Sequence, residues 1–331
     1  MNLVSAAPRH EHIAEWPAGL AGEGRTPRDV SAGVEMIGGL VAVHLRLAPQ
    51  RPGGTGDAAQ AQRDAHHVLR RVAAWAGRLT RFSTTSELSH LNADLDGAVP
   101  AGPTLTAVLD WGRAAEAATD GLVDIALLDA RLAAEGLAPA PPASPAATRT
   151  WSLERRPRGA LVRRPAGLRF DLDGVAKGWL ADRALQLLPG YPGVAIDADG
   201  DLAIRLAAGE RWRFGVTDPR TPGAQLAVLE LAPGRYGLAT SGTSVHRWLV
   251  DGTTRHHLVD PRTARSAATD VVQATVLAGS AREAEALAKA AVIAGSAAAL
   301  ALLERPAVLG ALLLTDGGAL LATPGTMRWL A

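Results

Sequence analysis

The chain has 331 residues, a formal net charge of +1 and 47% hydrophobic residues. This length and apolar content suit one large domain, or two of ordinary size, with a buried core, so disorder is not expected. Acidic and basic residues are interspersed without a basic stripe, which argues against a nucleic-acid partner. The absence of cysteine excludes disulfides, zinc–thiolate sites and cysteine nucleophiles.

No targeting or membrane segment is predicted. Residues 1–20 lack the basic start and the apolar run of a signal peptide. The most apolar window, residues 291–314, is interrupted by Glu304, Arg305 and Pro306, so it does not read as a membrane span. These patterns predict a cytoplasmic protein with no membrane partner.

In chain order, residues 1–32 mix Pro, Gly, His and Arg without periodicity and predict a loosely ordered arm. The domain is expected to span residues 33–331. It begins with a strand around residues 41–45, where apolar residues alternate. After a Gly/Pro/Gln-rich linker, apolar residues at spacings of three or four predict helices over residues 61–82 and 104–118.

A Pro- and Ala-rich stretch, residues 136–150, reads as a linker and the one plausible internal boundary. A late helix is expected from about Arg282 to Ala294. The pattern as a whole predicts an α+β fold, with a largely antiparallel sheet packed with helices. Short apolar runs between turn residues predict strands over residues 159–164, 167–172, 193–198, 201–206, 212–217, 225–231, 235–242 and 256–261.

The stretch "DLDGVAKGWLADRA", residues 171–184, carries the first candidate site. Lysine occurs only at Lys177 and Lys289 in a chain whose other basic residues are arginine. Gly174 and Gly178 allow close approach of a ligand, and Lys177 stands at a helix start, where backbone amides favour an anion. This arrangement predicts phosphate binding. The alternative is a helix capped by Asp173, with Lys177 in solvent.

Two further clusters follow a predicted strand or lie on one. Thr240, Ser241 and Thr243 surround Gly242 and offer hydroxyls to phosphate oxygens, although an ordinary Ser/Thr turn fits the same pattern. His257 lies three residues before Asp260, where a neutral imidazole can serve as a general base. A structural histidine is the alternative.

Two helix patterns complete the candidates. Glu285 and Lys289, four residues apart, are placed on one face of the late helix and predict a surface ion pair. Ser86 is expected at the start of another helix, and Asn92 at its end. Apart from Asn2, Asn92 is the only asparagine in the chain, so its amide is expected to have a particular partner.

In this order, the clusters resemble the FAD:protein FMN transferase family, the ApbE proteins. The resemblance runs from about residue 37 to the C-terminus and implies a T-fold-like α+β domain. It also implies FAD as substrate, Mg²⁺, and transfer of FMN to a Thr or Ser hydroxyl of an acceptor flavoprotein. It is carried by "RFSTTSELSHLN", "ATDGLVDIALL", "FDLDGVAKGWLADRA", "WRFGVTDP", "LATSGTSVHRW", "HHLVDPRT" and "ATVLAGSAREAEALAKAAVIAG".

The resemblance also implies roles for individual residues. His257 would activate the acceptor hydroxyl, and Gly174 would offer its carbonyl to the metal. The remaining expected contacts to the flavin nucleotide are Phe82, a strand formed by Asp124, Ile125 and Ala126, then Asp171, Lys177, Thr240, Ser241 and the backbone of Val259. Phosphoryl transfer depends mainly on charge neutralisation and alignment, which suits this residue set.

One departure from the family pattern concerns the metal. The family's metal site has an Asp followed four residues later by a Thr, and here these positions hold Glu285 and Lys289. An ammonium repels a divalent ion, so Lys289 is expected to stand in for Mg²⁺. Two alternatives to transfer follow: FAD binding with weak or lost transfer, and hydrolysis of FAD to FMN and AMP.

Overall fold

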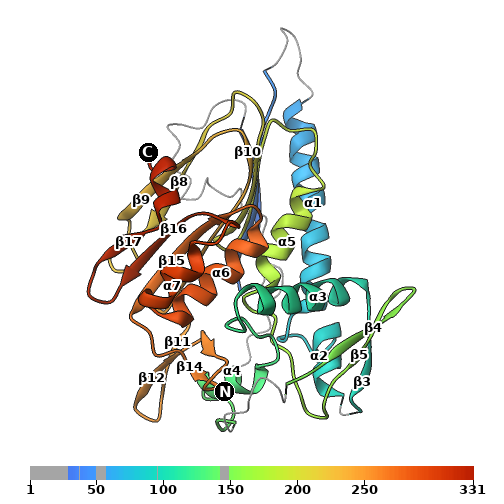
Figure 1. The fold of residues 1–331 in the computed structure, drawn as a ribbon. Coiled ribbons are helices and arrows are strands. Elements are labelled where there is room, and N and C mark those ends of the chain that lie inside the picture. Colours follow the sequence, from blue (N-terminus) through green and yellow to red (C-terminus); the bar gives the residue numbers. More distant parts are fainter. Residues whose placement is uncertain (1–28, 37, 50–56, 95, 142–148) are drawn as a thin grey trace.

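The computed structural model describes residues 29–36, 38–49, 57–94, 96–141 and 149–331. The main sheet in this part of the chain has eight strands, and each neighbouring pair is antiparallel (Figure 1). Its spatial order is β1 (Asp29–Met36), β2 (Gly39–Arg46), β6 (Gly193–Ala198), β7 (Asp201–Leu206), β10 (Gly234–Gly242), β15 (Val271–Ala278), β16 (Val308–Thr315) and β17 (Leu320–Ala322).

Smaller sheets and the helices surround this sheet. A three-stranded sheet has the order β3 (Ala98–Ala101), β5 (Gly159–Arg163), β4 (Ser152–Arg156). The hairpins are β8 (Trp212–Thr217) with β9 (Gln225–Leu231), β11 (Arg247–Val250) with β12 (Thr253–His256), and β13 (Val259–Asp260) with β14 (Arg265–Ser266). The helices are α1 (Asp57–Leu79), α2 (Glu87–Ala93), α3 (Pro103–Ala118), α4 (Leu128–Ala134), α5 (Ala176–Leu185), α6 (Ala281–Ala294), α7 (Ser296–Leu303) and a 3₁₀ turn, Pro324–Arg328.

Alternation along the strands gives the main sheet two covered faces. In β10, Leu238 belongs to the core beside the β8–β9 hairpin, while Ala239 belongs to the core under the helices. Leu277 and Val276 of β15 divide in the same way. Because successive side chains of a strand point to opposite faces, both faces of the sheet are apolar. Helices α1, α5 and α6 cover one face (Figure 1), and the β8–β9 hairpin packs on the other.

The predicted fold class is confirmed: helices pack on a large antiparallel sheet. The predicted helices correspond to α1, α3 and α6, and α6 begins one residue earlier than expected, at Ala281. Residues 1–28 of the predicted arm, residues 50–56 of the first linker and residues 142–148 of the second linker lie outside the described residues. Residues 29–32 belong to β1, because Val30 and Ala32 are buried in the core.

The strand predicted over residues 167–172 is wrong. This segment forms no ladder, because its backbone polar groups are bonded elsewhere. The Asn92 side chain accepts from the amide of Phe170 at 2.7 Å and donates to its carbonyl at 2.8 Å, and the amide of Asp171 donates to Ile125 at 2.8 Å. Asn92 thus has the particular partner expected for it, and that partner is the chain itself.

Helix α5 crosses α6 at close range through Gly178. A Cβ added at Gly178 would lie 2.6 Å from the carbonyl oxygen of Ala281, which no side chain tolerates. Asp182 of α5 accepts from the amides of Ala281 and Arg282, both at 3.2 Å, and so caps the start of α6. The two helices therefore form one rigid pair.

Within the described ranges, no helix combines the length and the apolar composition that crossing a membrane requires.

Candidate functional site

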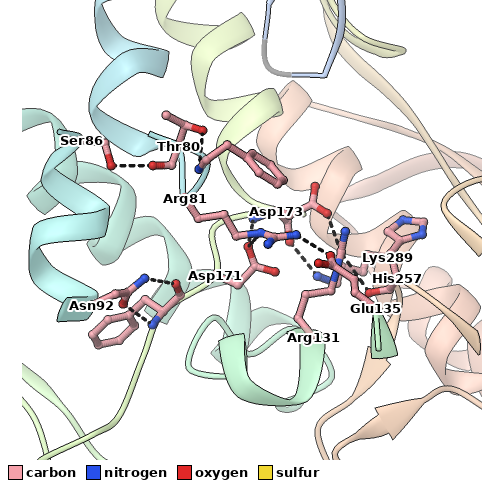
Figure 2. A network of polar contacts seen from close by, with 12 residues as sticks. Thr80, Arg81, Ser86, Asn92, Arg131, Glu135, Asp171, Asp173, His257 and Lys289 are labelled. Atoms are coloured by element: carbon pink, nitrogen blue, oxygen red, sulfur yellow. Dashed lines mark hydrogen bonds and ion pairs between the residues drawn. The ribbon is translucent and has the colours of Figure 1, made fainter. Parts of the chain in front are cut away.

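Three of the sequence candidates, Asp171, His257 and Lys289, lie together where the loop before α5 meets α4, α6 and the segment after β12 (Figure 2). This loop, residues 171–174, turns because the amide of Asp173 donates to the Asp171 carboxylate at 3.2 Å. Gly174 then adopts φ 99°, a conformation that side chains disfavour. The loop thus places the carboxylates of Asp171 and Asp173 close to Gly174, whose backbone is not covered by a side chain of its own.

Arginines compensate these carboxylates. Arg131 of α4 donates to Asp173 at 2.7 Å, and Nε of Arg81 lies 4.0 Å from Asp171. Both arginines also contact Glu135, and all three side chains are about nine-tenths buried. Burial raises the pKa of Asp171, and the nearby Asp173 charge adds to this. Burial also disfavours the Asp173 charge, but Arg131 and Lys289 outweigh it and hold the pKa of Asp173 well below its usual range.

Lys289 reaches this loop from α6. Its ammonium donates to the carbonyl of Asp173 at 2.9 Å. A Cβ at Gly174 would lie 2.6 Å from both Cδ and Nζ of Lys289, so the lysine side chain lies directly against this glycine. Glycine is therefore required here both for φ and for the approach of Lys289.

The predicted surface pair of Glu285 with Lys289 is wrong. Glu285 is only 2% exposed, and among the described residues no ion pair joins these two side chains. One oxygen of Glu285 accepts from the amide of Gly178 at 2.9 Å, so the carboxylate is directed toward α5. Burial and the Asp201 charge raise the pKa of Glu285 well above its usual value, although Lys177 opposes this shift.

His257 is half-buried beside the same loop (Figure 2). Its ring lies 5.3 Å from that of His246, centroid to centroid, and in the described part of the chain its buried Nδ1 has no hydrogen-bond partner. Burial lowers the pKa of His257 to about 3, with Asp173 opposing and Arg131 and Lys289 reinforcing the shift. The imidazole is therefore neutral at pH 7, the form in which histidine accepts a proton.

His257 and Asp260, predicted on one strand, do not share one, and no hydrogen bond or ion pair joins their side chains in the described part of the chain. Strand β12 ends at His256, and the Asp260 carboxylate is bonded to Arg262 at 2.8 and 2.9 Å. Val259 is buried in β13 and packs near Ala130 of α4, so only its backbone is available to a ligand.

Lys177 stands in the first turn of α5, as predicted, but it is not in solvent. Its ammonium lies 3.2 Å from the buried Asp201 carboxylate and 3.7 Å from that of Asp199, and a quarter of its side chain is exposed. Burial lowers its pKa, but Asp201, Glu285 and Asp173 together raise it above the usual value. Neither Asp173 nor another side chain caps α5, whose cap is Val175.

Thr240 and Ser241 occupy the end of β10 rather than a turn after it. The hydroxyl of Thr240 lies 2.9 Å from that of Thr275. Thr240 lines a cavity of about 200 Å³ together with Asp197 and Gly200, which belong to the hairpin that also carries Asp201. Thr240 thus faces the same side of the sheet as Leu238, beside the β8–β9 hairpin.

The remaining candidates divide by exposure. Phe82 is 82% exposed, with the guanidinium of Arg81 4.2 Å from its ring centroid, so one face of the ring is available. Residues 124–126 are not a strand but an irregular link between α3 and α4. Asp124 accepts from Arg149 at 2.8 Å and from the amide of Ala126 at 2.7 Å. Ile125 and Ala126 are buried, so any contact of theirs to a ligand is through backbone.

Sequence reasoning did not identify Arg81, Arg131 and Glu135 as members of this site. Arginine is the common basic residue of the chain, so the presence of an arginine at a position did not indicate a functional site. The spacing of four between Arg131 and Glu135 was the one pattern that pointed to a contact.

The donors at this place do not suit Mg²⁺, which requires an octahedron of oxygens. Lys289 places an ammonium against Gly174, and Glu285 is turned toward Gly178. Asp171 and Asp173 already face Arg81 and Arg131. Within the described ranges, no group of three His, Asp or Glu side chains is arranged to hold a metal ion.

Known proteins share parts of this sequence. An FAD:protein FMN transferase of Treponema pallidum is 33% identical over 135 residues, which make up 37% of this chain and 37% of the relative. One from Vibrio cholerae is 32% identical over 126 residues, again 37% of each chain. The matched segments thus span little more than a third of these curated relatives.

Solved structures share the fold over most of the chain. The ApbE flavinyl transferase of Pseudomonas stutzeri, in its apo form, has 20% identity and a TM-score of 0.72, covering 91% of this chain and 96% of that one. The ApbE protein of Thermotoga maritima has 20% identity and a TM-score of 0.74, covering 92% and 99%. A model of the ApbE family matches residues 41–313, and this chain therefore belongs to the ApbE family.

Proposed function

We propose that this protein transfers FMN from FAD to the hydroxyl of a Thr or Ser in an acceptor flavoprotein. The hydroxyl oxygen attacks the flavin-side phosphorus, and the bond from that phosphorus to the bridging oxygen breaks. AMP leaves with the bridging oxygen and its electron pair, and the hydroxyl proton passes to the imidazole of His257. The products are a phosphoester of FMN on the acceptor, AMP and one proton.

The observation that carries this proposal is the state of His257. It is neutral, and it lies beside a loop whose residue Asp173 is contacted by Lys289 and Arg131. A base next to cations suits attack on a phosphorus, because the cations neutralise charge on the diphosphate while the base accepts the proton.

Further contacts to the flavin nucleotide are proposed. Phe82 offers an exposed ring for the isoalloxazine, and the backbone of Asp124, Ile125, Ala126 and Val259 is proposed to contact the nucleotide. Asp171 and Lys177 are proposed contacts to the nucleotide, as are the hydroxyls of Thr240 and Ser241. No role in this step is proposed for Mg²⁺, which the resemblance implies, because the donors at the site do not suit the ion. A cytoplasmic location remains a prediction.

A second candidate is FAD binding without transfer. The contact of Lys289 with Gly174 favours it, because an ammonium carries one positive charge where Mg²⁺ would carry two. Hydrolysis, with water in place of the hydroxyl, is the third reading, and it gives FMN and AMP without an acceptor.

The test is incubation of the purified protein with FAD and a panel of acceptor domains that expose Thr or Ser. Transfer predicts covalent flavin fluorescence on an acceptor in a denaturing gel, with one AMP released per flavin attached. AMP without labelled acceptor identifies hydrolysis, and bound FAD with neither product identifies a binding protein.

A further inference from the structure

We infer that the ammonium of Lys289 takes the place of a divalent cation in this protein, so that flavin transfer proceeds without a metal at this site. The inference deepens the proposed function and rests on it for the transfer step. Its binding step is independent of transfer, because it concerns how the chain holds the diphosphate of FAD.

The position of Lys289 is the first support. Its Nζ donates to the carbonyl of Asp173 at 2.9 Å and lies against Gly174, which has no side chain to exclude it. A metal bound to backbone oxygen of this loop would have to displace the ammonium. Because the charge of the lysine is fixed to α6, the cation is present before any ligand arrives.

The oxygens around Lys289 are the second support. Glu285 lies one helical turn before Lys289. Its carboxylate accepts from the amide of Gly178 and is directed toward α5, which carries Lys177. The Asp173 carboxylate is 2.7 Å from Arg131, and Asp171 faces Arg81. Each of these carboxylates thus already has a protein partner. The second oxygen of Glu285 has no hydrogen bond in the described part of the chain, but a divalent ion would still meet three resident cations, Lys289, Arg131 and Arg81.

The chemistry of the ammonium is the third support. It has three N–H donors, and the structure shows one bonded to protein, at Asp173. The other two are able to donate to oxygens of a diphosphate lying over the loop. They would balance the negative charge that develops on the departing AMP, which is the task of a cation in phosphoryl transfer.

The experiment compares the wild type, Lys289→Met and the double variant Glu285→Asp/Lys289→Thr, each in excess EDTA and in excess Mg²⁺. FAD affinity is followed by flavin fluorescence, and transfer by labelling of the acceptor. We expect the wild type to bind and transfer equally well in both conditions. Lys289→Met should lose at least about tenfold in FAD affinity in both, the usual effect of removing a charged hydrogen bond. The double variant should bind FAD more tightly and transfer flavin faster in Mg²⁺ than in EDTA.

Arg282→Ala is the matched control. It removes one cation from the first turn of the same helix, where the guanidinium of Arg282 lies over the ring of Trp111. Its FAD affinity and transfer should equal those of the wild type.

Two results would overturn the inference. One is wild-type FAD affinity or transfer that EDTA abolishes and Mg²⁺ restores, a measurement that needs no variant. The other is a folded Lys289→Met protein with wild-type affinity. If no acceptor is ever labelled, the proposed function fails, while the affinity data still decide the role of Lys289.

Discussion

Lys177 of α5 and Asp201 of β7 form a contact of 3.2 Å between ammonium and carboxylate, and the carboxylate is only 3% exposed. Glu285, also buried, faces the same ammonium from α6. The ammonium of Lys177 thus links helix α5 to strand β7 of the main sheet.

Removing this cation should destabilise the fold. Lys177→Met leaves Asp201 and Glu285 buried without a positive partner, and we expect it to lower the free energy of unfolding by about 3 kcal/mol. Urea denaturation at pH 7.5 measures this change. The double variant Lys177→Met/Asp201→Asn removes one charge of each sign and should recover part of the loss. If its FAD affinity stays low after the fold is restored, Lys177 binds the ligand directly, whereas wild-type affinity would make its role structural.

Replacing His257 should separate binding from transfer. His257→Asn keeps a side chain of similar polarity but removes the proton acceptor, so transfer should fall by about 100-fold or more while FAD affinity changes little. Acceptor labelling and fluorescence titration measure the two quantities. His67→Asn, at an exposed position of α1, is the control and should leave both unchanged. An active His257→Asn protein would exclude the imidazole as the base.

The charge state of His257 gives a pH prediction. Its pKa in the folded protein is about 3, below the usual 6.5, so the unfolded chain binds a proton that the folded one does not. The contribution of His257 to stability is therefore complete above pH 6.5 and is lost as the pH falls toward 3. NMR of the free protein should show its ring neutral at pH 5. A ring that is charged at that pH would contradict the burial argument.

The contribution of Asp197 to stability should have the opposite pH dependence. Burial, with the Asp199 charge, raises its pKa from 3.8 to about 6, so the folded state holds its proton more tightly than the unfolded chain. Its contribution to stability is complete below pH 3.8 and is lost as the pH rises through 6. Asp197→Asn should thus stabilise the protein at pH 7.5 by on the order of 1–3 kcal/mol and have little effect at pH 4. Asp251→Asn, at a side chain that is 87% exposed, is the control in urea denaturation.

Phe82 should matter for ligand affinity and not for stability. Since its ring is 82% exposed, Phe82→Ala should leave the unfolding midpoint nearly unchanged. Loss of one stacking contact should weaken FAD binding by about threefold to tenfold. Phe82→Trp should retain the affinity. Leu249→Ala, at another exposed apolar position, is the comparison, and equal affinities in all four proteins would remove Phe82 from the site.

Local patterns predicted much of the fold, because helix and strand periodicity records which face is buried. The helix α3 and the strands β6 and β7 follow their patterns closely. The failure at residues 167–172 has a distant cause. Asn92, 78 residues away from Phe170, takes the backbone groups that a strand partner would use, and nothing near Phe170 in the sequence records this.

The site shows the same limit. The spacing of Glu285 and Lys289 predicted a pair, but Gly178, 107 residues away from Glu285, binds that carboxylate, and Asp173 binds the lysine. Both contacts depend on how α5 crosses α6, a tertiary property. Motifs identified which segments meet at the site, and only the structure identifies which atoms face each other.

The close crossing of α5 and α6 at Gly178 has a consequence for turnover. Lys177 and Lys289 belong to different helices of this rigid pair, so the crossing fixes the separation of their backbones and only the side chains can adjust to the ligand. The diphosphate of an intact dinucleotide can contact both ammonium groups at once. Each of the two monophosphates formed by cleavage can contact only one of them. The spacing of the two lysines would therefore favour retention of the uncleaved substrate and rapid escape of the nucleotide by-product.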